Sequence, residues 1–344
     1  MKMFITGGAG FVGCNCADHF LGQGHEVVIY DNLSRAGGPA NLAWLQGRHD
    51  RRLRFIQGDV RDAKLLATSM QGAEAVLHLA SQVAVTTSVE NPREDFEINA
   101  WGTFNVLEAV RHQAPEAAFL YASSNKVYGG MESVKVVDEG GRYAFADFVQ
   151  GIPENFPLDF HSPYGCSKGA GDQYTIDYAR IYGLRTVSLR QSCIYGRRQF
   201  GVEDQGWVAH FVIAAALGRP ITIYGDGRQV RDLLHVSDLV QAYELCIRHI
   251  DRLKGQALNL GGGPDNTITI WSEFGPLLAA LLGRQVEVRF DDWRPGDQKV
   301  FVANIARAAN WLGWRPTVTP AAGIGDLYEW VRANPELFAA RPGR

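Results

Sequence analysis

The feature that most restricts the fold of this chain is a glycine-rich turn near its N-terminus. A short apolar run, Met3–Thr6, leads into Gly7-Gly8-Ala9-Gly10-Phe11-Val12-Gly13, and apolar residues then follow at helical spacing through Leu21. Strand, tight turn and helix in this order are typical of a dinucleotide-binding unit. Gly7 and Gly10 would let the backbone approach a pyrophosphate, and Gly13 would let helix and strand pack closely. The free N–H groups at the helix start would hold the anion.

An acidic residue follows the next expected strand. Glu26–Tyr30 is apolar in its centre and ends in Asp31. A dinucleotide-binding fold places at this point the acid that accepts hydrogen bonds from the adenosine ribose. A carboxylate there repels a 2′-phosphate, which favours NAD over NADP. Arg35 leaves NADP open, because a nearby guanidinium can receive that phosphate.

Strands and helices continue to alternate along the chain. Further strands are expected at Leu53–Ile56, Ala75–Ala80, Phe119–Ser124 and Thr186–Leu189. The alternation predicts an α/β fold, a doubly wound parallel sheet of the Rossmann type whose ligand lies beyond the carboxyl ends of the strands.

The pattern becomes less regular after Arg190, which suggests two interleaved domains. We expect a dinucleotide-binding domain at 1–189, to which 233–262 returns through a strand near Leu258. A smaller mixed α/β domain at 190–232 and 263–344 would bind the substrate, since its arginines and aromatic residues suit a nucleotide.

Composition excludes several classes of protein. The 344 residues are 46% hydrophobic and 21% charged, as in a globular protein, and a net charge of −3 lacks the basic excess that nucleic acid or an anionic membrane requires. The five cysteines form no CxxC pair, so neither a metal site nor a disulfide framework is expected. Without a leader or a long apolar run, we expect a cytoplasmic protein.

A second motif lies at the start of a helix expected from Tyr164 to Arg180. Pro163 suits the first helical turn, and Ser162 before it can cap the helix. Tyr164 and Lys168, four residues apart, then share one helix face. A neighbouring cation favours the phenolate over the phenol, whose pKa is normally ~10, so the pair could abstract a proton. Such pairs also occur by chance on exposed helices.

Ser124 connects this motif to the sheet. It ends an expected strand, and Tyr164 can face the same sheet edge. The Ser124 hydroxyl, the Tyr164 phenol and the Lys168 ammonium would then converge beside a cofactor that accepts hydride.

Two other polar residues have less specific interpretations. His78 lies inside an apolar strand and is expected to be a hydrogen-bonded core residue rather than a catalyst. Asp59 follows a strand and either contacts an adenine amino group or caps the next helix.

With these motifs in order, the chain resembles the extended short-chain dehydrogenase/reductase superfamily, which includes nucleotide-sugar epimerases and dehydratases. The matching motifs are the glycine turn, Asp31-Asn32-Leu33, Gly58-Asp59-Val60-Arg61, Leu79-Ala80, Asn99, Ser123-Ser124, and Tyr164 with Lys168. Further segments make it similar to the CDP-tyvelose (CDP-paratose) 2-epimerases: Gln82–Ser88, Ser124–Gly129, Leu158–Lys168, Gly196–Phe200, Asp204–Trp207 and Gln229–Asp232. Gln191 departs from that family, where a histidine is expected.

The resemblance implies a tightly held NAD, a nucleotide-sugar substrate and a homo-oligomer, a dimer or tetramer. The implied catalytic residues are Ser124, Tyr164 and Lys168. The implied cofactor-binding residues are Gly7, Gly10, Phe11, Val12, Gly13, Asp31, Asn32, Ser34, Arg35, Asp59, Val60, Leu79, Ala80, Asn99, Tyr164 and Lys168. The implied substrate-binding residues are Thr86, Ser124, Asn125, Lys126, Gln191, Trp207, Arg231 and Arg294, with the two arginines on the diphosphate; both could equally be surface residues in ordinary salt bridges.

The residues after Ser124 bear on the reaction. The dehydratases of the superfamily carry Thr-Asp-Glu here, where this chain has Ser124-Asn125-Lys126. Without both carboxylates the chain has no evident acid/base pair for expelling water. The resemblance therefore implies an epimerase that oxidises carbon 2 of a CDP-linked hexose to a ketone and reduces it again from the opposite face. Inversion at carbon 4 of a UDP-hexose, or a dehydrogenase with net redox, uses the same three residues and stays open.

Overall fold

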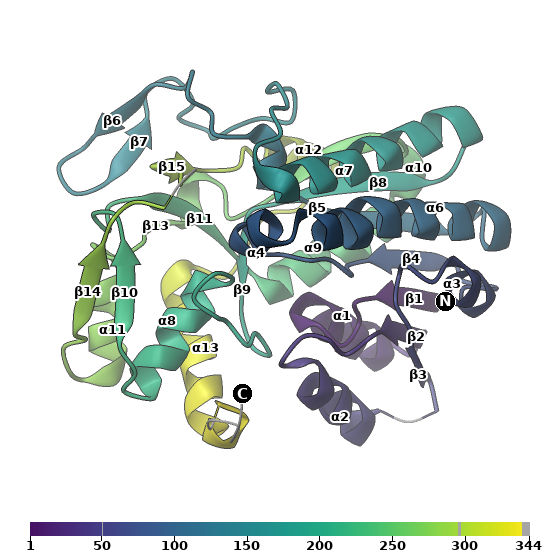
Figure 1. The fold of residues 1–344 in the computed structure, drawn as a ribbon, viewed down its shortest axis with the longest axis horizontal. Coiled ribbons are helices and arrows are strands. Elements are labelled where there is room, and N and C mark those ends of the chain that lie inside the picture. The colour runs from purple at the N-terminus through teal and green to yellow at the C-terminus, as the bar shows by residue number, and fades with distance from the viewer. Residues whose placement is uncertain (50, 295–296, 339–344) are drawn as a thin grey trace.

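The computed structural model describes residues 1–49, 51–294 and 297–338. Residues 295–296 and 339–344, which the sequence assigns to the substrate domain, lie outside the described residues. A parallel seven-stranded sheet in the order β12-β8-β5-β4-β1-β2-β3 forms the centre of the molecule (Figure 1). Its strands are β1 Lys2–Thr6, β2 Glu26–Asp31, β3 Leu53–Gln57, β4 Ala75–His78, β5 Ala118–Ser124, β8 Thr186–Gln191 and β12 Gln256–Leu260. The predicted α/β class and doubly wound parallel sheet are confirmed.

Helices cover both faces of this sheet because its buried strands are apolar on both sides. On β1, Met3 and Ile5 belong to one core cluster with residues of α1 and α9, whereas Phe4 belongs to another with residues of α3 and α6. Figure 1 shows α6 and α7 side by side on one face and α1 and α2 on the other. The helices are α1 Phe11–Gly22, α2 Gly38–Arg48 and α9 Val236–Arg248 on one face, and α3 Ala63–Ser69, α6 Gly102–Gln113 and α7 Ser162–Tyr182 on the other.

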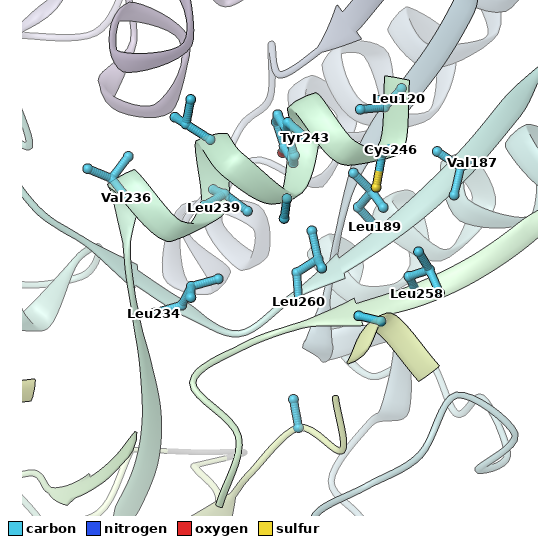
Figure 2. Close-up of a cluster of buried hydrophobic side chains, with 14 of the residues drawn as sticks. Leu120, Val187, Leu189, Leu234, Val236, Leu239, Tyr243, Cys246, Leu258 and Leu260 are labelled. Atoms are coloured by element: carbon cyan, nitrogen blue, oxygen red, sulfur yellow. The ribbon is translucent and has the colours of Figure 1, made fainter. Parts of the chain in front are cut away.

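Helix α9 closes the core over β5, β8 and β12. Leu239, Tyr243 and Cys246 of this helix point toward Leu189 and Leu260 of the two neighbouring strands (Figure 2). All of these side chains are fully buried. This packing holds β12 at the sheet edge, although it is separated from β8 by about a fifth of the chain.

The elements of the second half of the chain that belong neither to the large sheet nor to its covering helices gather beyond one end of the sheet, and we call them the second region (Figure 1). Strand β11 pairs in parallel with β9 and β15 and antiparallel with β13, and β10 pairs in parallel with β14. A separate apolar core lies under α8 and α13. Its elements are β9 Cys193–Tyr195, α8 Trp207–Ala216, β10 Ile221–Tyr224, β11 Val230–His235, β13 Thr267–Thr269, α11 Phe274–Leu282, β14 Val288–Asp291, β15 Val300–Phe301 and α13 Pro320–Ala333. The helices α10 Ile250–Leu253 and α12 Ala306–Leu312 instead contact β8 and β12 of the large sheet.

Short elements follow β4 and β5 at the edge where the sheet faces this second region. After β4 come α4 Val85–Glu90, α5 Pro92–Phe96 and a π-helical turn at Glu97–Trp101. After β5 come the 3-10 turn η2 Asn125–Tyr128 and a hairpin of β6 Val136–Asp138 and β7 Tyr143–Phe145. Among the described helices, not one combines the length and the apolar character that a membrane span needs.

Helix α7 begins next to the predicted residue, Pro163. Ser162 has a φ of +66°, outside the helical region, and its Oγ accepts a hydrogen bond from the N–H of Gly165 at 3.2 Å. This bond is the one that an N-cap makes, and Pro163 follows in the first turn. The capping bond predicted for Ser162 is present, whereas the helix begins one residue before Pro163, at Ser162, with His161 in the N-cap position.

Candidate active site

A cavity of about 790 Å³ lies where the carboxyl ends of β4, β5 and β8 face the second region. Ser124, Tyr164 and Lys168 line it on the sheet side, and Trp207, Arg231 and Arg294 on the other. The remaining residues that line it and that the sequence singled out are Phe11, Val12, Leu79, Thr86, Asn125, Lys126 and Gln191. A second hollow, of about 730 Å³ beside α11, is lined mainly by small and apolar residues, so we place the candidate site in the first.

The expected catalytic residues meet in this cavity. Ser124 is the last residue of β5, and the spacing on α7 places Tyr164 and Lys168 one turn apart. The backbone N–H of Tyr164 donates to Ser88 Oγ at 3.1 Å, which ties the start of α7 to α4.

The pKa values of Tyr164 and Lys168 move in opposite directions. Burial raises the pKa of Tyr164 to about 12, opposed by a hydrogen bond with Ser124. Burial lowers the pKa of Lys168 to about 7. The Lys168 Nζ donates to the carbonyl oxygen of Ala122 at 2.5 Å and lies 4.4 Å from the centroid of the Tyr121 ring. In the structure described, the pKa of the phenol is raised rather than lowered, because burial outweighs the hydrogen bond with Ser124. The effect of the Lys168 charge on the phenol stays a prediction.

A buried polar network behind this pair was missed in the sequence. Ser167 Oγ donates to one oxygen of Asp95 at 2.5 Å, and Asn99 Nδ2 donates to the other at 3.0 Å. Asn99 Oδ1 accepts from the N–H of Gln82 at 2.9 Å. The charge of Asp95 also raises the pKa of Lys168, opposing burial. Asp95 falls in a polar helical stretch of the sequence, so no local pattern marks it as buried.

The glycine turn has a backbone conformation that lets a ligand approach the main chain closely. Gly7 has a φ of +67°, and a Cβ there would lie 2.7 Å from the N atom of Ala80. A Cβ on Gly13 would overlap Gly7 O, whereas one on Gly10 would meet only that oxygen, at 3.1 Å, and otherwise open space. The turn thus presents bare backbone at the start of α1, which suits a pyrophosphate.

The expected ribose and adenine residues gather beside this turn. The Asp31 carboxylate accepts from the N–H groups of Ala9 at 3.0 Å and Leu33 at 2.8 Å. Asn32 Nδ2 donates to Asp59 at 2.9 Å, and the Ser34 N–H donates to Asn32 Oδ1 at 3.0 Å.

The structure excludes one of the two interpretations of Asp59, the capping of α3. Asp62, not Asp59, caps α3, since its side chain accepts from the N–H of Leu65; the capping interpretation of Asp59 is wrong. Asp59 pairs with Arg61 at 2.8 Å, and hydrogen bonds from Arg61 lower its pKa to about 2. Val60 is buried against Gly102.

His78 is a core residue, as expected. It is buried and hydrogen-bonds with Thr6 Oγ1 at 2.7 Å and Thr103 Oγ1 at 3.0 Å. Burial lowers its pKa to about 3, so the imidazole is neutral near pH 7.

The far side of the cavity carries arginines that are held by acids. Arg231 pairs with Asp297 at 2.8 Å. Arg294 pairs with Asp204 at 3.2 Å and lies 3.8 Å from the centroid of the Tyr224 ring. Both arginines form ordinary ion pairs, yet both line the cavity.

The other residues expected at the substrate differ in their surroundings. The amide of Gln191 donates to the hydroxyl of Tyr243. Trp207 packs against Phe211 and Phe274, with ring centroids 5.6 and 5.2 Å apart. Thr86 Oγ1 and Trp207 Nε1 are buried without a hydrogen-bond partner in the described part of the chain.

Arg35, expected at the cofactor, instead contacts the second region. Its Nη2 donates to Gln205 Oε1 at 2.8 Å, across the mouth of the cavity. The ammonium of Lys126 and the carboxylates of Asp204 and Asp297 are further charges in the cavity; neither acid was among the residues expected at the substrate.

Comparison with known proteins agrees with this geometry. The model of a family described as "NAD dependent epimerase/dehydratase family" matches residues 3–261. The chain belongs to this family. A CDP-paratose 2-epimerase from Salmonella typhi is 43% identical over 341 residues, which cover 96% of this chain and 99% of the relative. The predicted membership of the short-chain dehydrogenase/reductase superfamily is confirmed.

Solved structures in this epimerase/dehydratase family have the same fold. A UDP-glucose 4-epimerase from Thermus thermophilus, in complex with NAD, has a TM-score of 0.80 and 31% identity over 96% of this chain and 99% of that one. A dTDP-glucose 4,6-dehydratase from Streptomyces venezuelae, with NAD bound, has a TM-score of 0.84 and 29% identity over 98% of both chains.

Proposed function

We propose that this protein is an NAD-dependent nucleotide-sugar epimerase that inverts carbon 2 of a CDP-linked hexose of the CDP-paratose/CDP-tyvelose type. The single observation that carries the proposal is the 43% identity, over nearly the whole of both chains, to a CDP-paratose 2-epimerase. NAD is the cofactor of the family to which the chain belongs.

The residues present fit NAD. The bare backbone at Gly10 would receive the pyrophosphate, and Asp31 at the end of β2 would receive the adenosine ribose. The remaining cofactor residues that we propose are Gly7, Phe11, Val12, Gly13, Asn32, Ser34, Arg35, Asp59, Val60, Leu79, Ala80, Asn99, Tyr164 and Lys168. When bound, NAD supplies a hydride acceptor that takes a hydride from the sugar carbon and returns it.

The side chains of the cavity supply the acid–base chemistry. Tyr164 takes the proton from the hydroxyl on carbon 2 and later returns it, while Ser124 donates a hydrogen bond to the same oxygen. Lys168 stabilises the phenolate through its charge. The 2-keto sugar would then turn within the cavity so that its other face is reduced. Net redox is zero.

Dehydration is disfavoured by the 3-10 turn after Ser124. Asn125 and Lys126 line the cavity where an acid/base pair would be needed, and neither an amide nor an ammonium can replace two carboxylates. Inversion at carbon 4 of a UDP-hexose is the second candidate, because a UDP-glucose 4-epimerase has the same fold at 31% identity.

Product analysis tests the proposal. The purified enzyme is incubated with CDP-paratose, CDP-tyvelose and UDP-glucose, and the inverted stereocentre is located by NMR. We expect inversion at carbon 2 of the CDP-sugars without accumulation of NADH. Inversion at carbon 4 alone would favour the second candidate, and a stoichiometric rise in NADH absorbance would indicate a dehydrogenase.

We also propose the domain division expected from the sequence. Residues 1–189 and 233–262 would hold the dinucleotide, and 190–232 and 263–344 the nucleotide sugar. The large sheet, whose strands lie within 2–191 and 256–260, and the separate core under α8 and α13 support this division, whereas apolar residues of 300–314 pack in the core of the large sheet.

We infer further that the enzyme is a homodimer built on α6 and α7. Aromatic and aliphatic side chains are exposed on and beside these two adjacent helices, and Phe104 bridges Trp101 and Tyr174 with ring centroids 5.1 and 6.1 Å away. A contiguous apolar surface of this kind is typical of an interface. We call it the α6–α7 face, formed by Phe96, Trp101, Tyr174, Ile181 and Tyr182.

A further inference from the structure

Four cationic side chains line the cavity, and they differ in what holds them. Lys168 donates to the Ala122 carbonyl oxygen, Arg231 pairs with Asp297, and Arg294 pairs with acids of the loop before α8. The Lys126 ammonium has neither a hydrogen bond nor an ion pair within the described ranges. It is therefore the cation in this cavity most available to a ligand.

The surroundings of Lys126 favour an anion. Burial lowers the pKa of Lys126, and the Arg231 guanidinium lowers it further, while the charge of Asp297 opposes both. Two cations thus lie near one carboxylate, so this part of the cavity has an excess of one positive charge. A phosphate group would balance that charge and accept hydrogen bonds from the ammonium.

The backbone places Lys126 next to the catalytic serine. The Lys126 N–H donates to Ser124 Oγ at 3.2 Å, and this bond starts the 3-10 turn η2. The Ser124 hydroxyl thus holds the backbone of Lys126, and the side chains of both residues line the same cavity.

The chemistry of a nucleotide sugar relates the anion-binding surroundings of Lys126 to its position beside Ser124. Carbon 1 carries the diphosphate, carbon 2 is bonded to carbon 1, and carbon 4 lies across the ring. An enzyme that presents carbon 2 to Ser124 and Tyr164 must hold the sugar-linked phosphate close to them. An enzyme that presents carbon 4 to Ser124 and Tyr164 must hold this phosphate farther from them, on the opposite side of the sugar ring.

We propose that Lys126 binds the phosphate attached to the sugar and thereby presents carbon 2, rather than carbon 4, to Tyr164. Lys126 is then a positioning residue for the reaction, and this role rests on the proposed function. Arg231 and Arg294, which also line the cavity, remain for the nucleotide end of the diphosphate.

Nucleotides with one or two phosphates test the contact directly. Binding of CDP and CMP to the NAD-containing enzyme is measured by calorimetry for the wild type, Lys126→Met and Lys126→Arg. We expect Lys126→Met to weaken CDP by about 10- to 100-fold, the usual effect of losing a hydrogen bond to a charged group, and to leave CMP unchanged. Lys126→Arg, which keeps the charge, should retain most of the affinity for CDP. Lys64→Met, which removes an exposed lysine on α3, is the matched control and should change neither.

Equal affinities of the wild type and Lys126→Met for CDP would overturn the inference. So would a loss that is the same for CDP and CMP, because it would place the defect at the nucleoside. The pair UDP and UMP, measured alongside, tests the phosphate contact whichever base the enzyme prefers.

Kinetics separate this inference from the proposed function. If the wild type inverts carbon 2, Lys126→Met should raise KM and lower kcat, because a sugar held less firmly presents its carbon 2 less often. If instead Lys126→Met keeps kcat/KM within about twofold, the role of Lys126 is wrong while the proposed function stands. If the wild type does not invert carbon 2, the proposed function is wrong, and so is the role of Lys126 in presenting carbon 2 rather than carbon 4. The binding of CDP against CMP, and of UDP against UMP, still tests whether Lys126 contacts the phosphate.

Discussion

Tyr164 is buried against Ser124 at the end of β5, and among the three proposed catalytic residues its phenol is the group suited to take a proton. Ser124 can donate a hydrogen bond but is a poor base, and Lys168 holds the Ala122 carbonyl oxygen.

We expect Tyr164→Phe to reduce kcat by about 10²- to 10⁴-fold, the usual contribution of a general acid–base. The bound NAD should remain, because the glycine turn and Asp31 are untouched. The measurements are turnover by NMR and the dinucleotide released on denaturation. Tyr328→Phe, which alters a phenol on α13 outside the cavity, is the control. Near-normal turnover by Tyr164→Phe would contradict the mechanism.

Lys168 is a buried cation, and its pKa predicts a pH dependence of stability. Its pKa falls from 10.5 to about 7 on burial. Between these values the unfolded chain binds a proton that the folded chain does not, so stability rises with pH from about 7 to about 10. Below pH 7 the folded protein carries the full cost of a buried charge.

Lys168→Met should therefore be inactive but more stable than the wild type, by on the order of 3 kcal/mol near pH 7. Denaturant unfolding of both proteins after removal of the dinucleotide measures the difference, which should shrink toward pH 10. A difference independent of pH would mean that Lys168 is not the titrating group.

Among the elements, α1 depends most on its glycines. Gly13 lies where α1 passes Gly7 and Gly8, and a Cβ there would overlap the backbone of the turn. The turn and the helix start therefore form one rigid unit whose N–H groups face the cavity side of β1.

Gly13→Ala should push the helix start away from the turn and lower the amount of NAD bound by at least about 10-fold. Gly22→Ala, at the far end of the same helix, is the control, because a Cβ there has no atom within 4 Å. Fluorescence titration with NADH measures both. Full NAD content in Gly13→Ala would show that the close packing does not set the shape of the site.

The molecule as a whole leaves the α6–α7 face exposed. Ile181, 62% exposed, lies near the end of α7. If two copies pair through this face, Ile181→Glu introduces two charges into an apolar interface and should convert the dimer to a monomer. Light scattering after size-exclusion chromatography measures the mass. Val149→Glu, an exposed apolar residue outside these helices, should leave the mass unchanged, and a monomeric wild type would contradict the proposal.

Much of this architecture can be predicted from local patterns. The strands of the large sheet lie within a few residues of the apolar runs, because a strand buried on both faces must be apolar throughout. The glycine turn and the Tyr164–Lys168 spacing could also be recognised in the sequence. A turn with positive φ and a pair of residues four apart on a helix depend on neighbouring residues in the chain rather than on distant ones.

Contacts between distant parts of the chain could not be predicted in this way. The pKa of Tyr164 rises rather than falls because the surrounding elements bury it, and Asp95 becomes a core residue only when α5 packs on α7. Arg231 meets Asp297, and Lys126 has no side-chain partner among the described residues, through the packing of β11 and the C-terminal segment against the edge of the sheet. Periodicity fixes which face of an element is buried, but the charges that meet in a cavity depend on which faces pack together. That choice is made by the assembled core.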